Sequence, residues 1–161
     1  MIKKTLRKGL GFGLTSGTIT TIGLMVGLYS TTNSKLAVIG GILTIAIADS
    51  FSDALGMHVS EEFESKKSAK EVWEATFFTL IFKFIFSSIF IIPILIFELP
   101  TAIFISALFG LFVIGIFSFK FAKEQNNKPW KSVVEHLLIA SLVIFLTYHL
   151  GYLINLILDL N

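Results

Sequence analysis

Two acidic residues, Asp49 and Asp53, lie in a stretch of the chain that is otherwise suited to lipid. They are four residues apart, and four residues advance an α-helix by about 40°, so the two side chains share one face. A carboxylate in the interior of a bilayer costs about 2.5–3.5 kcal/mol on insertion scales, and such residues usually face a partner or a hydrated cavity. The pair therefore indicates a cation-binding or proton-transferring site inside a membrane helix.

Further donor groups continue along this face toward the polar segment that follows. Carboxylate oxygens supply negative charge for a divalent cation, and a thioether favours softer ions such as Fe²⁺ over Mg²⁺ and Ca²⁺. The first apolar stretch adds hydroxyls four residues apart. The sequence thus predicts metal ligands at Asp49, Asp53, Met57, Glu61, Glu62 and Glu64, the glutamates attracting ions at the mouth, and a path lined by Ser16, Thr20 and Ser60.

Lys83 offers a second explanation for the two aspartates, because it lies near the middle of a later apolar stretch. Its ammonium would neutralise Asp49 or Asp53 and form a buried structural pair. Two carboxylates and one ammonium still leave a net negative charge, which favours the cation site. Removing the charge of Lys83 separates the two interpretations: a structural pair would lose folding, whereas a regulatory charge would change only transport.

Five stretches are long and apolar enough to cross about 30 Å of hydrocarbon, which takes about 20 residues each. The chain is 54% hydrophobic and only 15% charged, with a mean hydropathy of +0.82, whereas a soluble domain of this length needs more polar surface. We therefore expect an all-α polytopic membrane protein forming one transmembrane domain over 1–161, with a charged cytoplasmic linker at 60–71 and spans at about 9–29, 36–59, 72–97, 101–121 and 133–158.

Basic residues predict how these spans are oriented, because Lys and Arg accumulate on the cytoplasmic side. In the five-span arrangement Lys35 alone falls on one side, and Lys83 lies within a span. The N terminus is therefore predicted to be cytoplasmic and the C terminus external. The other eleven basic residues all fall on the cytoplasmic side: Lys3, Lys4, Arg7, Lys8, Lys66, Lys67, Lys70, Lys120, Lys123, Lys128 and Lys131.

Several classes of function are disfavoured by what the sequence contains. It has no cysteine, which excludes disulfides, thiolate nucleophiles and Cys-ligated metals. It shows no nucleotide-binding motif or Ser-His-Asp spacing, and a net charge of +2 gives no reason to expect nucleic acid. The basic start and first apolar stretch could form a signal peptide, but the length of that stretch favours a retained helix. We expect neither an enzyme nor a permanently bound cofactor.

Glycines repeat at four-residue spacing in the first span, at Gly9, Gly13 and Gly17 and again at Gly23 and Gly27. Small residues at this spacing let two helix backbones approach closely within a membrane. Packing inside one subunit and a seam between two copies both fit this pattern.

Three segments resemble the vacuolar iron transporter family: GLTSGTITTIGLMVGL at 13–28, DALGMHVSEE at 53–62, and the two distal spans with their basic loop at 110–151. Five spans with the N terminus inside also agree with this family. The resemblance implies a homodimer that moves Fe²⁺, and often Mn²⁺, out of the cytosol, typically in exchange for protons. Because the pathway in such proteins runs along the first two helices near the dimer axis, the resemblance favours the seam interpretation of the first-span glycines.

The chain departs from the family pattern at three positions. Ser16 stands where the family typically has Asp, Asp53 where it has Met, and Met57 where it has Glu. The acid and the thioether are thus rearranged, and Asp49 is an additional carboxylate. The large acidic cytoplasmic domain of some members is reduced here to the short linker. These departures are typical of a divergent, short prokaryotic-type member.

We therefore expect a cell-membrane transporter of Fe²⁺ or Mn²⁺ whose partners are a divalent metal ion, membrane lipid and a second copy of the chain. Two other functions compete with this one. The first is a non-transporting membrane subunit in which Asp49, Asp53 and Lys83 form a structural cluster. The second is a proton- or sodium-coupled carrier of another solute.

Overall fold

The computed structural model describes residues 2–64 and 67–158, and this part of the chain is helical apart from short connections. Within these described residues, five segments are long and apolar enough to cross a membrane. The prediction of an all-α protein with five spans is therefore confirmed. The helices are α1 (Ile2–Thr32), α2 (Lys35–Glu62), α3 (Ala69–Ser88), α4 (Ile91–Ile96), α5 (Leu99–Glu124) and α6 (Pro129–Leu158).

Serine side chains start two of these helices. The Ser34 hydroxyl accepts a hydrogen bond from the backbone N–H of Ala37 at 3.2 Å and caps α2. Ser68 and Glu71 form a reciprocal capping box at the start of α3, which satisfies backbone donors that the first turn leaves unpaired. The connection between α2 and α3 is consequently shorter than the expected linker at 60–71, because both helices extend into it.

The third predicted span is interrupted. It was expected as one helix over 72–97, but α3 ends at Ser88 and the short α4 completes the span. Pro93 explains the break, because proline has no N–H to donate and its ring clashes with the carbonyl four residues earlier, that of Ile89. Ile89 is accordingly the residue that caps the end of α3.

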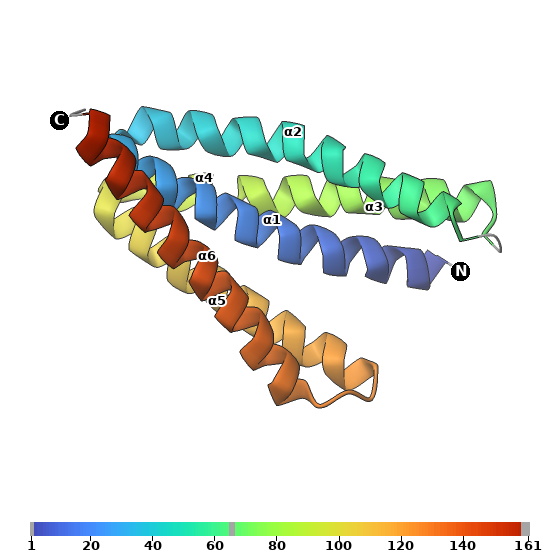
Figure 1. Ribbon diagram of the computed structural model, residues 1–161. Coiled ribbons are helices and arrows are strands. Elements are labelled where there is room, and N and C mark those ends of the chain that lie inside the picture. Colours follow the sequence, from blue (N-terminus) through green and yellow to red (C-terminus); the bar gives the residue numbers. More distant parts are fainter. Residues whose placement is uncertain (1, 65–66, 159–161) are drawn as a thin grey trace.

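Helix α1 is the central element and contacts α2, α3, α5 and α6. The chain termini lie at opposite ends of the bundle, as an odd number of spans requires (Figure 1). Helices α5 and α6 diverge from α1, α2 and α3 toward the end where the N terminus lies (Figure 1). We call this the basic end; the expected cytoplasmic residues that the structure describes there are Lys4, Arg7, Lys8, Lys67, Lys70, Lys120, Lys123, Lys128 and Lys131. Lys66 and the side chain of Lys3 lie outside the described part.

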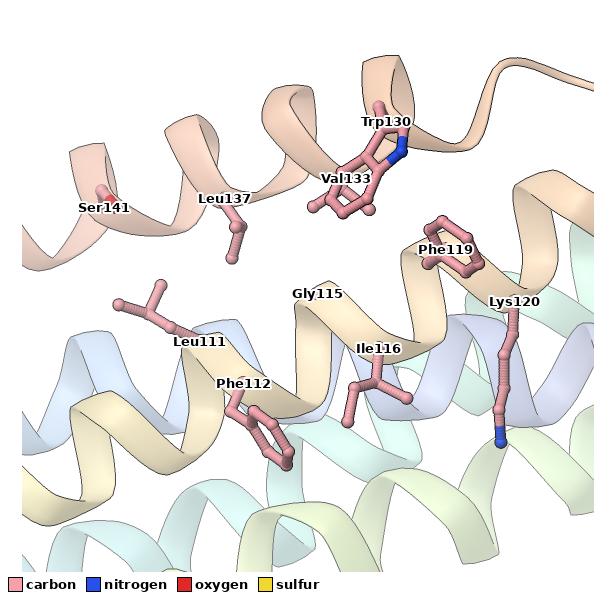
Figure 2. A pocket seen from close by; sticks show the side chains of 10 residues that line it. All are labelled: Leu111, Phe112, Gly115, Ile116, Phe119, Lys120, Trp130, Val133, Leu137 and Ser141. Atoms are coloured by element: carbon pink, nitrogen blue, oxygen red, sulfur yellow. The ribbon is translucent and has the colours of Figure 1, made fainter.

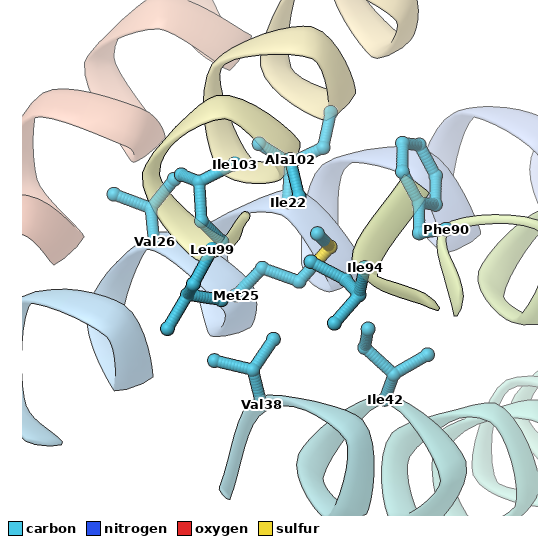
Figure 3. Close-up of a cluster of buried hydrophobic side chains, with 10 residues drawn as sticks. All are labelled: Ile22, Met25, Val26, Val38, Ile42, Phe90, Ile94, Leu99, Ala102 and Ile103. Atoms are coloured by element: carbon cyan, nitrogen blue, oxygen red, sulfur yellow. The ribbon is translucent and has the colours of Figure 1, made fainter. Parts of the chain in front are cut away.

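A cluster of apolar side chains packs the helices together away from the basic end (Figure 3). Ile94 is fully buried in this cluster although α4 is only six residues long. The break before α4 thus supplies a side chain to the core instead of ending the packing. The cluster consists of Ile22, Met25, Val26, Val38, Ile42, Phe90, Ile94, Leu99, Ala102 and Ile103.

The first-span glycines pack within the subunit. A Cβ atom added at Gly9 would lie 2.5 Å from the Cβ of Phe78, and one added at Gly17 would lie 3.1 Å from the backbone oxygen of Lys83. A Cβ atom at Gly23 would lie 2.8 Å from Val143 on α6. The seam interpretation of these glycines is therefore wrong, because their open faces are already filled by α3 and α6.

Candidate cation site

Helices α2 and α3 bring three charged side chains together near the middle of the bundle. Lys83 on α3 is fully buried, and its Nζ lies 2.5 Å from Oδ2 of Asp49. The same ammonium forms an ion pair with Asp53. Asp49 lies near the midpoint of α2, so these charged side chains are far from both ends of that helix.

Two hydroxyls of α1 complete the site. Ser16 Oγ donates to Asp53 Oδ2 at 2.7 Å and accepts from Lys83 Nζ at 2.9 Å. Thr20 Oγ1 lies 3.1 Å from Asp49 Oδ2 and 2.9 Å from the carbonyl oxygen of Ser16. The expected pathway residues Ser16 and Thr20 therefore touch the carboxylates directly.

The two carboxylates are not sealed inside the subunit. The side chain of Asp49 is 27% exposed and that of Asp53 is 22% exposed, whereas Lys83 is inaccessible. Met57, one turn nearer the basic end, is half-buried, and Ser60 is exposed. The exposed edges of these residues form an open flank of α2.

Glu61 and Glu64 belong to a separate cluster at the basic end, which we call the Glu61 cluster. Glu61 is buried and pairs with both Lys8 of α1 and Lys67 of the α2–α3 connection. Glu64 lies 2.7 Å from Lys67 Nζ and 3.4 Å from Lys8 Nζ. Since Asp53 and Glu61 are eight residues apart on one helix, about 12 Å separates this cluster from the site above.

The Glu61 cluster perturbs its own ionisable groups. The hydrogen bond from Lys67 holds the pKa of Glu64 below its ordinary value of 4.5. Burial acts to lower the pKa of Lys67, but the hydrogen bonds to Glu61 and Glu64 outweigh it and raise that pKa above its ordinary value. Both groups are therefore held in their charged forms at neutral pH.

Glu62 belongs to neither group and lies beside His58. Its carboxylate lies 3.5 Å from Nε2 of His58, and Nδ1 of that ring lies 3.0 Å from the hydroxyl of Thr76 on α3. His58 also meets Trp73 edge to face. His58 thus faces away from the aspartates, as its helical position indicates.

The six expected metal ligands are therefore distributed along the half of α2 nearer the basic end and the connection that follows it, and they are not gathered in one place. Among the residues that the structure describes, no group of three or more His, Cys, Asp and Glu side chains is arranged to hold a metal ion. Asp49 and Asp53 are brought together with Lys83, Ser16 and Thr20. From the described residues, the site offers a cation two carboxylates and the hydroxyl oxygens beside them.

Sequence reasoning missed two features of this region. Thr79 is fully buried, and its hydroxyl has no hydrogen-bond partner within the described chain. Thr79 lies four residues before Lys83, and this spacing places both side chains on one face of α3. The spacing is visible in the sequence and could have identified Thr79. The pairing of Glu61 with Lys8 was not visible in the sequence, because 53 residues separate them.

An apolar cavity of about 760 Å³ opens between α5 and α6 (Figure 2). Lys120 and Ser141 are the polar side chains among those that line it. The lining side chains come from α5 and α6 and none from α1, α2 or α3. This cavity is therefore separate from the cation site and suits an apolar occupant.

Comparison with known proteins supports the family resemblance. The sequence profile of the VIT family matches residues 57–152, which is more than half of the 161 residues. The matched region includes Met57 and Lys83 but begins after Asp49 and Asp53. No curated protein matches the chain. With five spans and this match, the chain belongs to the VIT family and is a multi-pass protein of a kind that carries metal ions across membranes.

Proposed function

We propose that this protein exports divalent transition-metal ions, Fe²⁺ or Mn²⁺, from the cytosol across the cell membrane in exchange for protons. The observation that carries the proposal is the pair Asp49 and Asp53 at mid-span, with the Ser16 and Thr20 hydroxyls hydrogen-bonded to them. Carboxylates in a bilayer interior are costly, and they usually mark an ion pathway. A divalent cation would balance the charge of both.

The route we propose follows the open flank of α2 from the basic end. Glu62, whose side chain is 62% exposed, would attract cations there, whereas the charge of Glu64 is already paired with Lys8 and Lys67. Ser60 and Met57 lie between this mouth and the aspartates, and the thioether of Met57 favours Fe²⁺ over Mg²⁺. Because a carboxylate must be deprotonated to bind metal, release of the ion lets protons bind, which supports exchange.

We further propose that the protein is a homodimer whose seam is the outer face of α2. This face carries small residues at four-residue spacing, and a Cβ atom added at Gly40 or Gly56 would have no neighbour within 4 Å. Small residues at this spacing permit close helix contact in membranes. The exposed stripe consists of Gly40, Thr44, Ala48, Ser52, Gly56 and Ser60.

The exposure of the aspartates gives an independent reason for a second copy. In a lone subunit, the exposed parts of Asp49 and Asp53 would face hydrocarbon, where charge is strongly disfavoured. A partner α2 beside the stripe would shield them from lipid and enclose a hydrated path between the subunits. Membrane lipid would then contact the remaining apolar surface, which includes the outer side chains of α6.

The proposal is tested by metal flux in proteoliposomes. We expect uptake of Fe²⁺ or Mn²⁺ that depends on a pH gradient, and a fall of at least about tenfold in Asp49→Asn and Asp53→Asn, since each removes a ligand charge. Glu98→Gln is the matched control, because Glu98 is an exposed acid at the opposite end of the bundle. Flux in both aspartate variants equal to that of the parent would refute the ligand assignment.

A second function is favoured by the ion pairs of Lys83 with both aspartates. In that case the three groups are a structural cluster of a non-transporting subunit. It predicts that removing any one charge destabilises the fold and that divalent ions stabilise neither the parent nor the variants. Thermal melting in detergent with and without Mn²⁺ distinguishes this function from transport.

A further inference from the structure

The ammonium of Lys83 already sits in an oxygen shell of the kind that a metal cation would use. An ammonium has three N–H donors. Here it donates hydrogen bonds to Oδ2 of Asp53 and Oγ of Ser16, and a third oxygen, Oδ2 of Asp49, lies beside it as an ion pair. These oxygens come from α1 and α2, whereas the cation comes from α3. The shell is therefore formed around a cation that the chain itself supplies.

We propose that Lys83 is a tethered cation that occupies the cargo position between Asp49 and Asp53, and that a transported ion binds there only by displacing it. This inference rests on the proposed function. Two carboxylates and the ammonium leave one net negative charge, so a divalent ion added beside the ammonium would create a buried net positive charge and like-charge repulsion. Displacing the ammonium instead leaves the two carboxylates and the divalent ion balanced at the site itself, and the greater distance from the ion weakens the repulsion on the ammonium.

The displaced ammonium needs another acceptor, and we assign this role to Thr79 on the same helix. Thr79 lies one turn before Lys83 on the same face of α3, and side chains four residues apart are neighbours. Its buried hydroxyl has no hydrogen-bond partner in the described part of the chain. A buried hydroxyl without a partner is costly in a folded protein, and receiving the ammonium in the ion-loaded state gives Thr79 a role.

A tethered cation would affect both the affinity for the transported ion and the rate of transport. Competition with the ammonium weakens ion binding, and its return to the aspartates helps to expel the ion. It also halves the negative charge of the empty site, from two to one, while the transporter resets, so no metal ion is needed to stabilise that state. Removing the ammonium should therefore tighten binding while slowing transport, a combination that a purely structural pair does not predict.

The test measures Mn²⁺ binding to purified protein and Mn²⁺ flux in proteoliposomes for Lys83→Met. We expect Mn²⁺ to bind Lys83→Met at least tenfold more tightly than it binds the parent, and Mn²⁺ flux through the variant to be slower. We also expect the substitution to lower the melting temperature and Mn²⁺ to restore it. Lys35→Met is the matched control at an exposed lysine, and it should behave as the parent does. Binding to Lys83→Met that is no tighter than to the parent, with no rescue by Mn²⁺, would overturn the proposal.

A charge-balanced pair of variants decides the question if Lys83→Met does not fold. Asp53→Asn/Lys83→Met has the same net charge at the site as the parent, and it should bind Mn²⁺ more tightly than Asp53→Asn alone. Equal binding in these two variants would overturn the tethered cation while leaving transport by the parent intact. Absence of Mn²⁺ flux in the parent would instead refute the proposed function.

Thr79→Val tests the acceptor separately. It should slow flux without weakening Mn²⁺ binding by the same factor, because the ammonium loses its alternative partner. Ser106→Ala is the control, since Ser106 on α5 is also buried with an unpartnered hydroxyl. Equal flux in the two variants would exclude Thr79 as the acceptor.

Discussion

A Cβ atom added at Gly13 would lie 2.8 Å from the backbone nitrogen of Lys83. Helices α1 and α3 thus meet almost backbone to backbone at the level of the buried ammonium. This close approach places Ser16 of α1 within hydrogen-bond distance of Lys83. The absence of a side chain at Gly13 is therefore a condition for assembling the cation site.

Gly13→Ala should destabilise the protein by about 1–3 kcal/mol, the usual cost of forcing extra atoms into a packed interior. Its new methyl group meets backbone, which cannot rotate away. Gly115→Ala is the control, because a Cβ atom there would meet Leu137 at an ordinary 3.9 Å. Reversible unfolding in mixed micelles measures both variants, and equal stability of the two would contradict the packing described for Gly13.

Ser52→Cys should form a disulfide-linked dimer in membranes under mild oxidation. Ser52 lies in the middle of the small-residue stripe of α2, and residues near a twofold axis approach their own copies. The natural chain has no cysteine, so a single introduced thiol reports one contact. Ser141→Cys on exposed α6 serves as the control; crosslinking of Ser141→Cys but not of Ser52→Cys would place the seam elsewhere.

Lys67→Gln should lower the melting temperature more than Lys70→Gln does. Lys67 pairs with buried Glu61 and with Glu64, and loss of one partner leaves a buried carboxylate less compensated. Lys70 is 76% exposed and lies 4.0 Å from Glu74, and exposed pairs of this kind contribute little. Thermal melts of both variants at pH 7 in one detergent measure the two melting temperatures. Equal melting temperatures would show that Lys67 does not stabilise the buried carboxylate of Glu61.

The Glu61 cluster should also make stability depend on pH at the acid end. The pKa of Glu64 is lower in the folded protein than its ordinary value of 4.5, so its contribution is present above about pH 4.5 and is lost as the pH falls through the lowered pKa. For Lys67, whose pKa is raised above its ordinary 10.5, the loss occurs only in strong alkali.

Melting temperatures of the parent and of Glu64→Gln, measured from neutral pH down to pH 3, test this dependence. The parent should lose more stability over this range than the variant, because the variant has no carboxylate at position 64 to protonate. Glu98→Gln, which removes an acid outside the cluster, should follow the parent. Parallel curves for the parent and Glu64→Gln would show that the cluster does not supply the dependence.

The sequence by itself determined the helical class, the five spans and the shared face of Asp49 and Asp53. Each of these follows from local properties: runs of apolar residues long enough for a bilayer, and the 3.6-residue period of the α-helix. The concentration of lysines in three segments likewise follows from their order along the chain. The family match agrees with this pattern.

Only the tertiary structure decided which partners these residues have. The depth of Lys83 in its span predicted a pair with Asp49 or Asp53, but only the packing of the helices shows that it contacts both. Ser16 reaches Asp53 across 37 residues, and nothing in that sequence separation predicts the hydrogen bond. The packing of the helices also decides that α3 and α6 fill the space beside the α1 glycines. It likewise decides that lysines from two other segments neutralise Glu61. Side chains can fill a groove between helices in many ways, and the close fit that selects one of them exists only when all the helices are assembled.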